Sequence, residues 1–479
     1  MKIFPSASES PIDNITPEKI VAHYITTGGD ERLVLRDNGL NKYHVSPVQF
    51  EGILNRGSCT CSPFTEEGYR KALDIASHLC STLDYDEVQL RCIRRIKESI
   101  NYEYQDRFDV FLAPSGSDLF YYPLLFSKLL YADNKPILNL LTCPEELGSG
   151  SLLASSGQYY SSMNQFGEHI PKSLPLSLDL NVETKTYPAR CAEGNILDPT
   201  QRLYEDIWRY RESHTLIGRL VVGSKSGIEN DLRIISETSD SVLWVIDLCQ
   251  FRVSKTFINA LIGMNCLVMI TGSKFYQAPP FCGALLVPKI VSNCFKKAVA
   301  SDIEPFAAIF SRYDIPQEFP DIRAELRSLR NHGLFLRWEA ALHEIEAFKR
   351  LDSIAVATAI HAWQQTIVER LSRGNRFRKM PSPIFPYYTI VSFQVQGAGY
   401  FLGYDELKQL YTAICQDTHE GFSRYEKVLF GQPVRYGSGA FIRLAIGAEN
   451  IRRIVASNCD FSDDLRLIQV IDNYVSKLF

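Results

Sequence analysis

Two charged side chains stand just after two apolar runs in the middle of the chain. The run 242–246 ends in Asp247, and the run 266–270 is followed by a short polar segment that contains Lys274. Both runs are short, rich in branched residues and not alternating, which predicts buried parallel strands. The segment 253–262 between them has helical spacing and completes a strand–helix–strand unit. Because ligands bind at the carboxyl ends of such strands, we expect Asp247 and Lys274 side by side at one edge of the sheet.

This pair of residues has a known chemical use. Burying a lysine and an aspartate costs free energy, so the two are rarely placed at strand ends without a reason. A lysine amine forms a Schiff base with the aldehyde of pyridoxal phosphate, and an aspartate keeps the ring nitrogen of that cofactor protonated. From these two residues alone, a structural ion pair at the sheet edge and a lysine solvated in a loop remain open as alternatives.

Further motifs of the same stretch resemble one protein family. The motifs Asp-Leu-Cys-Gln (247–250) and Thr-Gly-Ser-Lys (271–274), followed by 279–287 with its glycine, resemble the class V branch of the fold type I pyridoxal-phosphate enzymes. That branch contains aminotransferases, cysteine desulfurases and related lyases. The resemblance implies one role for each matching residue: Asp247 at the pyridine nitrogen, Gln250 at the ring hydroxyl, Lys274 as the Schiff-base lysine, and Thr271 and Ser273 at the phosphate.

An anion site is also predicted upstream of these motifs. The expected strand 108–113 leads into Ser115-Gly116-Ser117 and then into a helix over 119–130. The free N–H groups and the dipole of a helix N-terminus favour phosphate. Such a turn is also an ordinary helix cap, but the family holds the cofactor phosphate in a turn of this kind. The resemblance therefore implies that Ser115, Gly116 and Ser117 bind the phosphate.

Two acidic residues follow the next expected strand, 137–141. The family commonly places a histidine or an aromatic ring there to stack on the cofactor, and this chain has Glu145 and Glu146 instead. We predict that Glu146 binds the substrate, either as an acid/base or by holding a cation. The alternative is that both acids are exposed loop residues.

The substrate carboxylate has its own candidate near the end of the chain. The run 440–447 resembles the C-terminal strand of the family, whose arginine clamps the substrate carboxylate through two hydrogen bonds, and this makes Arg443 the candidate. An arginine in an exposed sheet needs no such role, and Arg435 and Arg312 are weaker choices. Lys225 is a rival for the Schiff base, but its Ser/Gly setting suits a phosphate or substrate loop better.

Composition limits the class of protein. The chain has 479 residues, of which 45% are hydrophobic and 22% charged, so it is long enough for two or three folded domains. A net charge of -4 indicates neither a nucleic-acid nor a membrane partner. Residues 1–19 lack the apolar core of a signal peptide, and the 12 cysteines lack disulfide-framework spacing, which predicts a cytoplasmic protein. Cys59 and Cys61 have no second pair at zinc spacing, so no metal is expected.

The expected fold class is α/β, with a three-layer αβα large domain around a mostly parallel sheet of the seven-stranded type and a smaller α+β C-terminal domain. The expected division is 1–86 as a segment that covers the active-site mouth, 87–300 as the cofactor-binding domain and 301–479 as the small domain. Helices are expected at 86–103, 199–212, 306–314, 324–351 and 404–415, and further strands at 32–35, 216–222, 387–395 and 441–446.

The resemblance implies an aminotransferase-like enzyme that acts on an amino acid or an amine and works as a homodimer. Three alternatives stay open. A lyase of the desulfurase type needs a nucleophilic cysteine, whereas Cys415 falls in a predicted core helix. In the decarboxylases a histidine usually precedes the lysine, and Ser273 stands there instead. A non-catalytic scaffold of the same fold is the third alternative.

Overall fold

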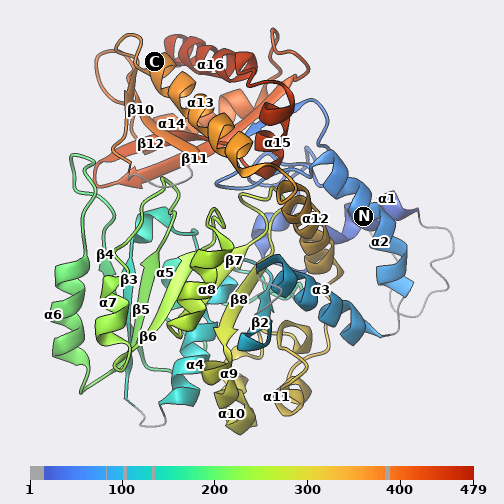
Figure 1. Ribbon diagram of the computed structural model, residues 1–479, viewed down its shortest axis with the longest axis vertical. Helices are drawn as coiled ribbons and strands as arrows, with labels where there is room; N and C mark the ends of the chain where they lie inside the picture. Colours follow the sequence, from blue (N-terminus) through green and yellow to red (C-terminus); the bar gives the residue numbers. More distant parts are fainter. Residues whose placement is uncertain (1–15, 82–83, 101–104, 132–134, 383–388) are drawn as a thin grey trace.

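The computed structural model describes residues 16–81, 84–100, 105–131, 135–382 and 389–479. Two sheets stand one above the other in Figure 1, a large one in the lower half and a smaller one near the C-terminus. The two sheets differ in strand direction and in the part of the chain that builds them.

The large sheet has seven strands in the order β2-β8-β7-β6-β5-β3-β4. Every neighbouring pair is parallel except the two that involve β8, which runs antiparallel to both β2 and β7. This confirms the mostly parallel seven-stranded sheet. The bounds are β2 (Phe108–Ala113), β3 (Ile137–Thr142), β4 (Val182–Tyr187), β5 (Thr215–Val221), β6 (Val242–Leu248), β7 (Leu267–Thr271) and β8 (Gly283–Pro288).

Helices cover both faces of the large sheet, because alternate residues of each strand point to opposite sides. In β6, Trp244 and Ile246 belong to one buried cluster and Leu243 and Val245 to the other. The first cluster includes side chains from α3 (Tyr85–Ile100), α6 (Thr200–Tyr210), α7 (Arg233–Thr238) and α8 (Lys255–Gly263). The second includes α4 (Tyr122–Leu130) and the segment around Phe306. These are the expected three layers.

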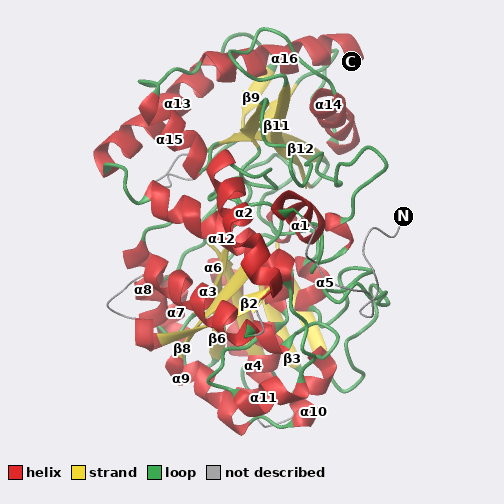
Figure 2. Cartoon of the chain, turned by 90° about the vertical axis from the view of Figure 1, so that its right-hand side faces the viewer, coloured by secondary structure: helices red, strands yellow, loops and turns green. Residues whose placement is uncertain are grey.

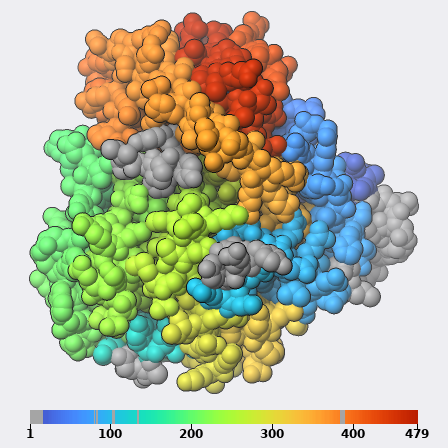
Figure 3. All heavy atoms as spheres, in the orientation of Figure 1, coloured from blue at the N-terminus to red at the C-terminus, as the bar shows by residue number. Residues whose placement is uncertain are grey.

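The small sheet has the order β1-β11-β12-β10-β9. Its strand β1 (Ile53–Arg56) comes from the N-terminal segment and pairs in parallel with β11 (Lys427–Tyr436), which the sequence analysis did not anticipate. The other strands are β9 (Phe377–Lys379), β10 (Ile390–Val395) and β12 (Gly439–Ala445). Four helices accompany them, namely α13 (Ser353–Leu371), α14 (Tyr404–Gln416), α15 (Ala448–Ala456) and α16 (Ser462–Leu478). Figure 2 shows this sheet above the large one, and Figure 3 shows its orange and red surface at the top of the molecule.

The N-terminal segment packs on a central helix. Helices α1 (Pro17–Tyr24) and α2 (Glu66–Ser81) both contact α12 (His332–Phe348). Arg337 of α12 donates hydrogen bonds to the backbone carbonyls of Ile25 and Thr27, each at 3.0 Å, and so fixes the turn before residue 30. The domain division of the sequence analysis stays a prediction, since residues before 86 contribute to the small sheet and also contact α12.

Several local predictions were wrong. Instead of a strand at 32–35, the chain forms a single helical turn at Glu31–Leu33, because the Asp30 side chain accepts a hydrogen bond from the Arg32 N–H group. The expected helix 306–314 consists of short turns, and 324–351 is divided into α11 (Pro320–Glu325) and α12. The Asn331 side chain begins the second helix by accepting from the Leu334 N–H group. Residues 101–104 of the expected helix 86–103 lie outside the described part, as do 383–388, which include the beginning of the expected strand 387–395.

The remaining helices are short: α5 (Ser151–Ser155), α9 (Lys289–Ser292) and α10 (Ala300–Ile303). Within the described residues, none of the helices combines the length and the apolar character that a membrane crossing requires.

Candidate active site

One cavity opens at the carboxyl ends of β5, β6 and β7. Asp247 and Lys274 both line it, so the central expectation of the sequence analysis, that the two residues share one site, agrees with the geometry. The cavity wall also contains most of the other predicted residues, namely Ser115, Gly116, Ser117, Glu146, Gln250, Thr271 and Ser273. Arg443 is the only predicted site residue that is absent from this wall.

The ends of β6 and β7 are held in register. Asp247 pairs with Met269 across the two parallel strands, and its Oδ1 accepts a hydrogen bond from the Cys249 N–H group at 2.8 Å. The Thr271 hydroxyl donates to the Cys249 carbonyl at 2.7 Å. These bonds fix where both strands stop, and therefore where the Asp247 carboxylate and the segment with Lys274 enter the cavity.

The predicted phosphate turn reaches the same strand ends. The Ser115 hydroxyl accepts hydrogen bonds from the N–H groups of Ser117 and Asp118, at 3.1 and 3.3 Å, which closes the turn before α4. A Cβ atom on Gly116 would lie 3.2 Å from the Cys249 Sγ and from the Thr271 Cγ2 atom. Glycine at 116 therefore lets the turn pack against β6 and β7.

An arginine from the N-terminal segment lies at this turn, and the sequence analysis missed it. Arg32 donates to the Ser115 hydroxyl at 3.0 Å and to the Ser117 hydroxyl at 3.4 Å, and pairs with the Asp30 carboxylate at 2.6 Å. Burial and the nearby Asp30 charge raise the pKa of Asp118 to about 6. No sequence pattern relates Arg32 to a turn so far along the chain, because only tertiary folding brings them together.

Glu146 lines the cavity, but its oxygens are already hydrogen-bonded. Its carboxylate forms a buried ion pair with Arg190 at 3.1 Å and accepts from the Ser226 N–H group at 2.9 Å. The hydroxyls of Ser224 and Ser226 also donate to it. The alternative that both acids are exposed loop residues is wrong for Glu146, which is 3% exposed. The geometry favours a residue that positions the 224–226 loop, and a direct role on the substrate stays a prediction.

Arg443 lies on β12 behind the cavity wall and is fully buried. Its Nε donates to the Cys59 Sγ at 3.1 Å, and Cys59 itself lines the cavity. Its Nη1 and Nη2 atoms have no hydrogen-bond partner among the described residues. A Cβ on the opposite Gly431 would lie 2.8 Å from Nε, so glycine leaves room for this side chain. Arg435 and Arg312, the weaker candidates, are outside the cavity wall.

Lys225 is a second lysine of the cavity wall. Its Nζ lies 3.4 Å from the Glu145 carbonyl oxygen, and no carboxylate forms an ion pair with it in the described part of the chain. Burial, with the charges of Arg443 and Lys274 next in importance, lowers the pKa of Lys225 to about 7.

The cavity also offers apolar surface where the family has a stacking ring. Leu147, Phe120 and Val221 line the cavity, together with Tyr43 and Phe281 from other segments of the chain. These side chains are candidates for covering an aromatic cofactor, and the sequence offered no spacing that would have identified them.

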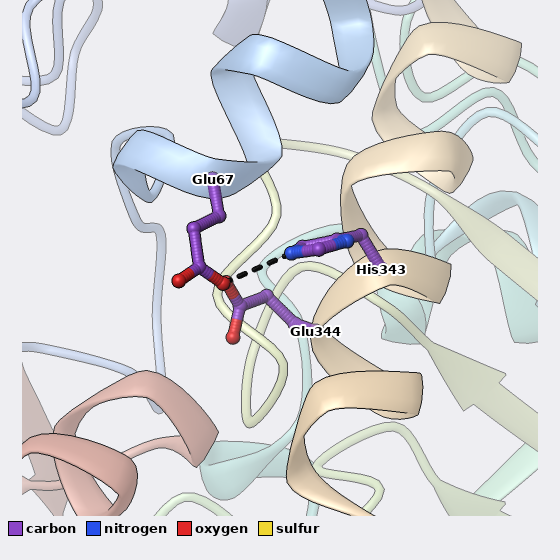
Figure 4. A group of neighbouring side chains, drawn as sticks. All are labelled: Glu67, His343 and Glu344. Carbon is purple, nitrogen blue, oxygen red and sulfur yellow. Dashed lines mark hydrogen bonds and ion pairs between the residues drawn. The ribbon is translucent and has the colours of Figure 1, made fainter.

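One cluster outside the cavity has the residue types of a metal site. Glu67, His343 and Glu344 present ligand atoms within 4.8 Å of one another (Figure 4). Arg452 donates to both carboxylates, at 3.0 and 3.1 Å, and so supplies the positive charge that a metal ion would bring. The cluster is an ion-pair network that joins α2, α12 and α15.

Comparisons with known proteins identify the fold. No family model and no curated protein match the chain. Among solved structures, it is similar to the cysteine desulfurase CsdA (S-sulfonic acid) from Escherichia coli, with TM-score 0.54 and 11% identity over 89% of this chain and 95% of that one. It is also similar to Oryza sativa TDC with PLP, with TM-score 0.52 and 12% identity over 98% and 90% of the two chains. A third is ureidoglycine-glyoxylate aminotransferase from Bacillus subtilis, with TM-score 0.51, 11% identity and coverages of 88% and 94%. The chain therefore has the fold of the fold type I pyridoxal-phosphate enzymes.

Proposed function

We propose that this chain is a pyridoxal-phosphate-dependent enzyme that acts on an amino acid or an amine, with aminotransferase chemistry as the first choice. The observation that carries the proposal is the cavity shared by Asp247 and Lys274 at the ends of two adjacent parallel strands. Donors without a hydrogen-bond partner among the described residues support a ligand in this region: the Ser151 hydroxyl lines the cavity, and the two Nη atoms of Arg443 lie behind its wall.

The residues present fit the cofactor. Bound pyridoxal phosphate would supply an electron sink for charge that develops at the substrate Cα atom. Asp247 would keep the ring nitrogen protonated, and Lys274 would hold the cofactor and move the proton at Cα. The remaining roles follow the resemblance: Gln250 at the ring hydroxyl, Ser115, Gly116, Ser117, Thr271 and Ser273 at the phosphate, Arg443 at the α-carboxylate through its two free nitrogens, and Glu146 at the edge of the substrate site.

The cofactor assignment is tested by chemical labelling. The purified protein is incubated with pyridoxal phosphate, reduced with borohydride, digested and examined by mass spectrometry. We expect the label on Lys274, no label in Lys274→Ala, and an unchanged label in the matched variant Lys225→Ala. A label on Lys225 would overturn the assignment of the lysine. A folded wild-type protein that takes no label would overturn the proposed enzyme and leave the scaffold alternative.

The type of reaction needs a second measurement. In a screen of amino acids, an aminotransferase transfers the amino group to the cofactor and releases the matching oxo acid. Release of pyruvate, sulfide or carbon dioxide without amino transfer would instead identify the lyase or the decarboxylase alternative.

A carbon–sulfur lyase is the second candidate, because two cysteines of the N-terminal loop, Cys59 and Cys61, line the cavity. Cys415 is buried in α14, as expected, and stays outside the cavity wall. If the lyase is of the desulfurase type, a cavity cysteine takes the sulfur from substrate cysteine as a persulfide, alanine is released, and added dithiothreitol reduces the persulfide to sulfide. Cys59→Ser should then abolish sulfide release in the presence of dithiothreitol, while Cys415→Ser retains it.

The assembly and the location of the protein are two further proposals. We propose a homodimer, which equilibrium sedimentation tests, because the family builds its active sites at the subunit interface. We also propose a reducing, cytoplasmic location, supported by the free state of every cysteine that the structure describes.

A further inference from the structure

Three cations at or behind one side of the cavity wall have no acidic partner in the described part of the chain. Lys225, in the loop after β5, lines the cavity, and Arg443 of β12 is buried behind the wall; neither forms an ion pair with a carboxylate among the described residues. Arg252 is also buried behind the wall, and its hydrogen-bond partners are neutral: the Gln250 side chain, the hydroxyls of Ser58 and Thr389, and the Ile446 carbonyl. Buried cations without anions cost free energy, so this side of the site is suited to a negatively charged ligand.

The nearby acids are already in use. Glu146 is bonded to Arg190 and to the 224–226 loop, and the Glu145 carboxylate accepts from the Ala189 N–H group at 3.1 Å. The Asp247 carboxylate accepts from the Cys249 N–H group and is the proposed partner of the ring nitrogen. None of these three acids forms an ion pair with Lys225 among the described residues.

The cofactor phosphate is predicted at a separate place. Arg32 contacts the hydroxyls of both Ser115 and Ser117 there, and its own charge is paired with Asp30. Lys225 follows β5, and its Nζ lies against the loop after β3, whereas the turn 115–117 follows β2 and packs against the ends of β6 and β7. Lys225 therefore lies on the other side of the cavity from this turn, where we place the substrate.

We infer that the substrate is an amino acid with a second acidic group, and that Lys225 binds this group while Arg443 binds the α-carboxylate. The inference rests on the proposed function and names its substrate class. Arg443 has two nitrogens without a hydrogen-bond partner among the described residues, buried behind the wall next to Cys59, and such a pair suits a carboxylate held by two hydrogen bonds. Lys225 is a partly exposed point charge on the cavity wall, which suits a carboxylate or a phosphate ester.

The test compares ligand pairs that differ only in the charge of the side chain. Calorimetry with the cofactor-loaded protein measures dissociation constants for L-aspartate against L-asparagine and for L-glutamate against L-glutamine, and O-phospho-L-serine against L-serine distinguishes a phosphate from a carboxylate. We expect the acidic member of at least one pair to bind more tightly. In Lys225→Met this preference should fall by about ten- to a hundred-fold, the usual value of a hydrogen bond to a charged group. Lys225→Arg should retain most of it.

A pH series gives a second readout. An acid beside Lys225 stabilises its protonated form, so acidic ligands should bind more weakly as the pH rises above about 7, while the neutral amides should not, and Lys225→Met should remove the difference. Equal binding within all three pairs, or an unchanged preference in Lys225→Met, would overturn the inference. Succinate and glutarate have no amino group, so they can be titrated into the protein before cofactor is added. Their binding tests the acidic subsite alone, and labelling of Lys274 tests the cofactor site alone, so the failure of one proposal is distinguishable from the failure of the other.

Discussion

At the scale of single residues, the charged side chains of the site differ in whether their neighbours come from nearby or from distant parts of the sequence. Asp247 and Lys274 are placed by the ends of adjacent strands, and a short sequence motif surrounds each of them. Arg32, Asp118 and Lys225 are different, because their neighbours come from distant segments. The first group therefore follows from local sequence, whereas the second group was missed or left without a definite role.

Asp118 provides a pH-dependent test of the phosphate turn. Its pKa of about 6 in the folded protein is higher than the ordinary value of 3.8, so the folded state takes up a proton between these values. The stability that this group contributes is present at low pH and is lost as the pH rises through 6. Asp118→Asn should remove this loss and raise the free energy of unfolding at pH 7, relative to wild type, by roughly 1–3 kcal/mol.

Urea unfolding of both proteins at pH 4, 5, 6 and 7 measures the effect. The difference between them should grow with pH, and a difference that is constant across the series would contradict the assignment. Because Asp118 adjoins the turn, the variant should also bind pyridoxal phosphate more tightly, since a nearby negative charge is gone.

Gly431 gives a test of the path taken by the Arg443 side chain. A Cβ at 431 would meet the Arg443 Nε atom at 2.8 Å, so Gly431→Ala should displace the guanidinium from the Cys59 thiol. We expect weaker binding of substrate carboxylates with little change in cofactor labelling. Gly399→Ala is a control for the substitution itself at an exposed turn, where no atom lies within 4 Å, although its positive φ adds local strain. Unchanged carboxylate binding in Gly431→Ala would contradict a role for Arg443.

At the scale of elements, the three residues of Figure 4, from α2 and α12, form an ion-pair network with Arg452 of α15 and so join three helices from distant parts of the chain. Glu344 of α12 is nearly fully buried, accepts a hydrogen bond from the Thr65 hydroxyl at 2.6 Å and pairs with Arg452 of α15. Glu67 of α2 accepts from His343 and from Arg452. This network couples α2 to α15 through α12.

Removing the arginine should therefore be costly. Arg452→Met leaves the buried Glu344 carboxylate with the Thr65 hydroxyl and without an arginine, and we expect it to lower the free energy of unfolding by about 1–3 kcal/mol. The matched control Arg70→Met removes a pair on the exposed face of α2, where both side chains are about half or more exposed, and should change stability by less than about 1 kcal/mol. Chemical denaturation of the two variants measures this. Equal effects would contradict a structural role for the network.

At the scale of the whole molecule, one buried cluster extends through both sheets. It contains Trp244 of β6, Trp338 of α12 and Trp363 of α13, together with Leu54 of β1 and Val428 of β11. A shared core of this kind couples the two parts energetically. We therefore expect one cooperative unfolding transition in which tryptophan fluorescence and far-ultraviolet circular dichroism coincide. Two separated transitions would show that the sheets unfold independently.

The sequence by itself predicted the large sheet and the meeting of Asp247 and Lys274 at one cavity. Buried parallel strands are short apolar runs, and a motif at the end of such a run stays at the edge of the sheet however the rest of the chain folds. This is why β6, β7, the turn 115–117, Asp247 and Lys274 could be predicted. The helix predictions at 306–314 and 324–351 failed because periodicity alone does not locate the points where a helix stops.

Only the tertiary structure decided which charges meet. Four contacts join segments far apart in the chain. They are the parallel pairing of β1 with β11, the contact of Arg32 with the predicted phosphate turn, the ion pair of Glu146 with Arg190, and the hydrogen bond of Arg443 to Cys59. Sequence spacing carries no information about such contacts. Their energies depend on burial and on neighbouring charges, and both exist only once the two sheets have closed around the cavity.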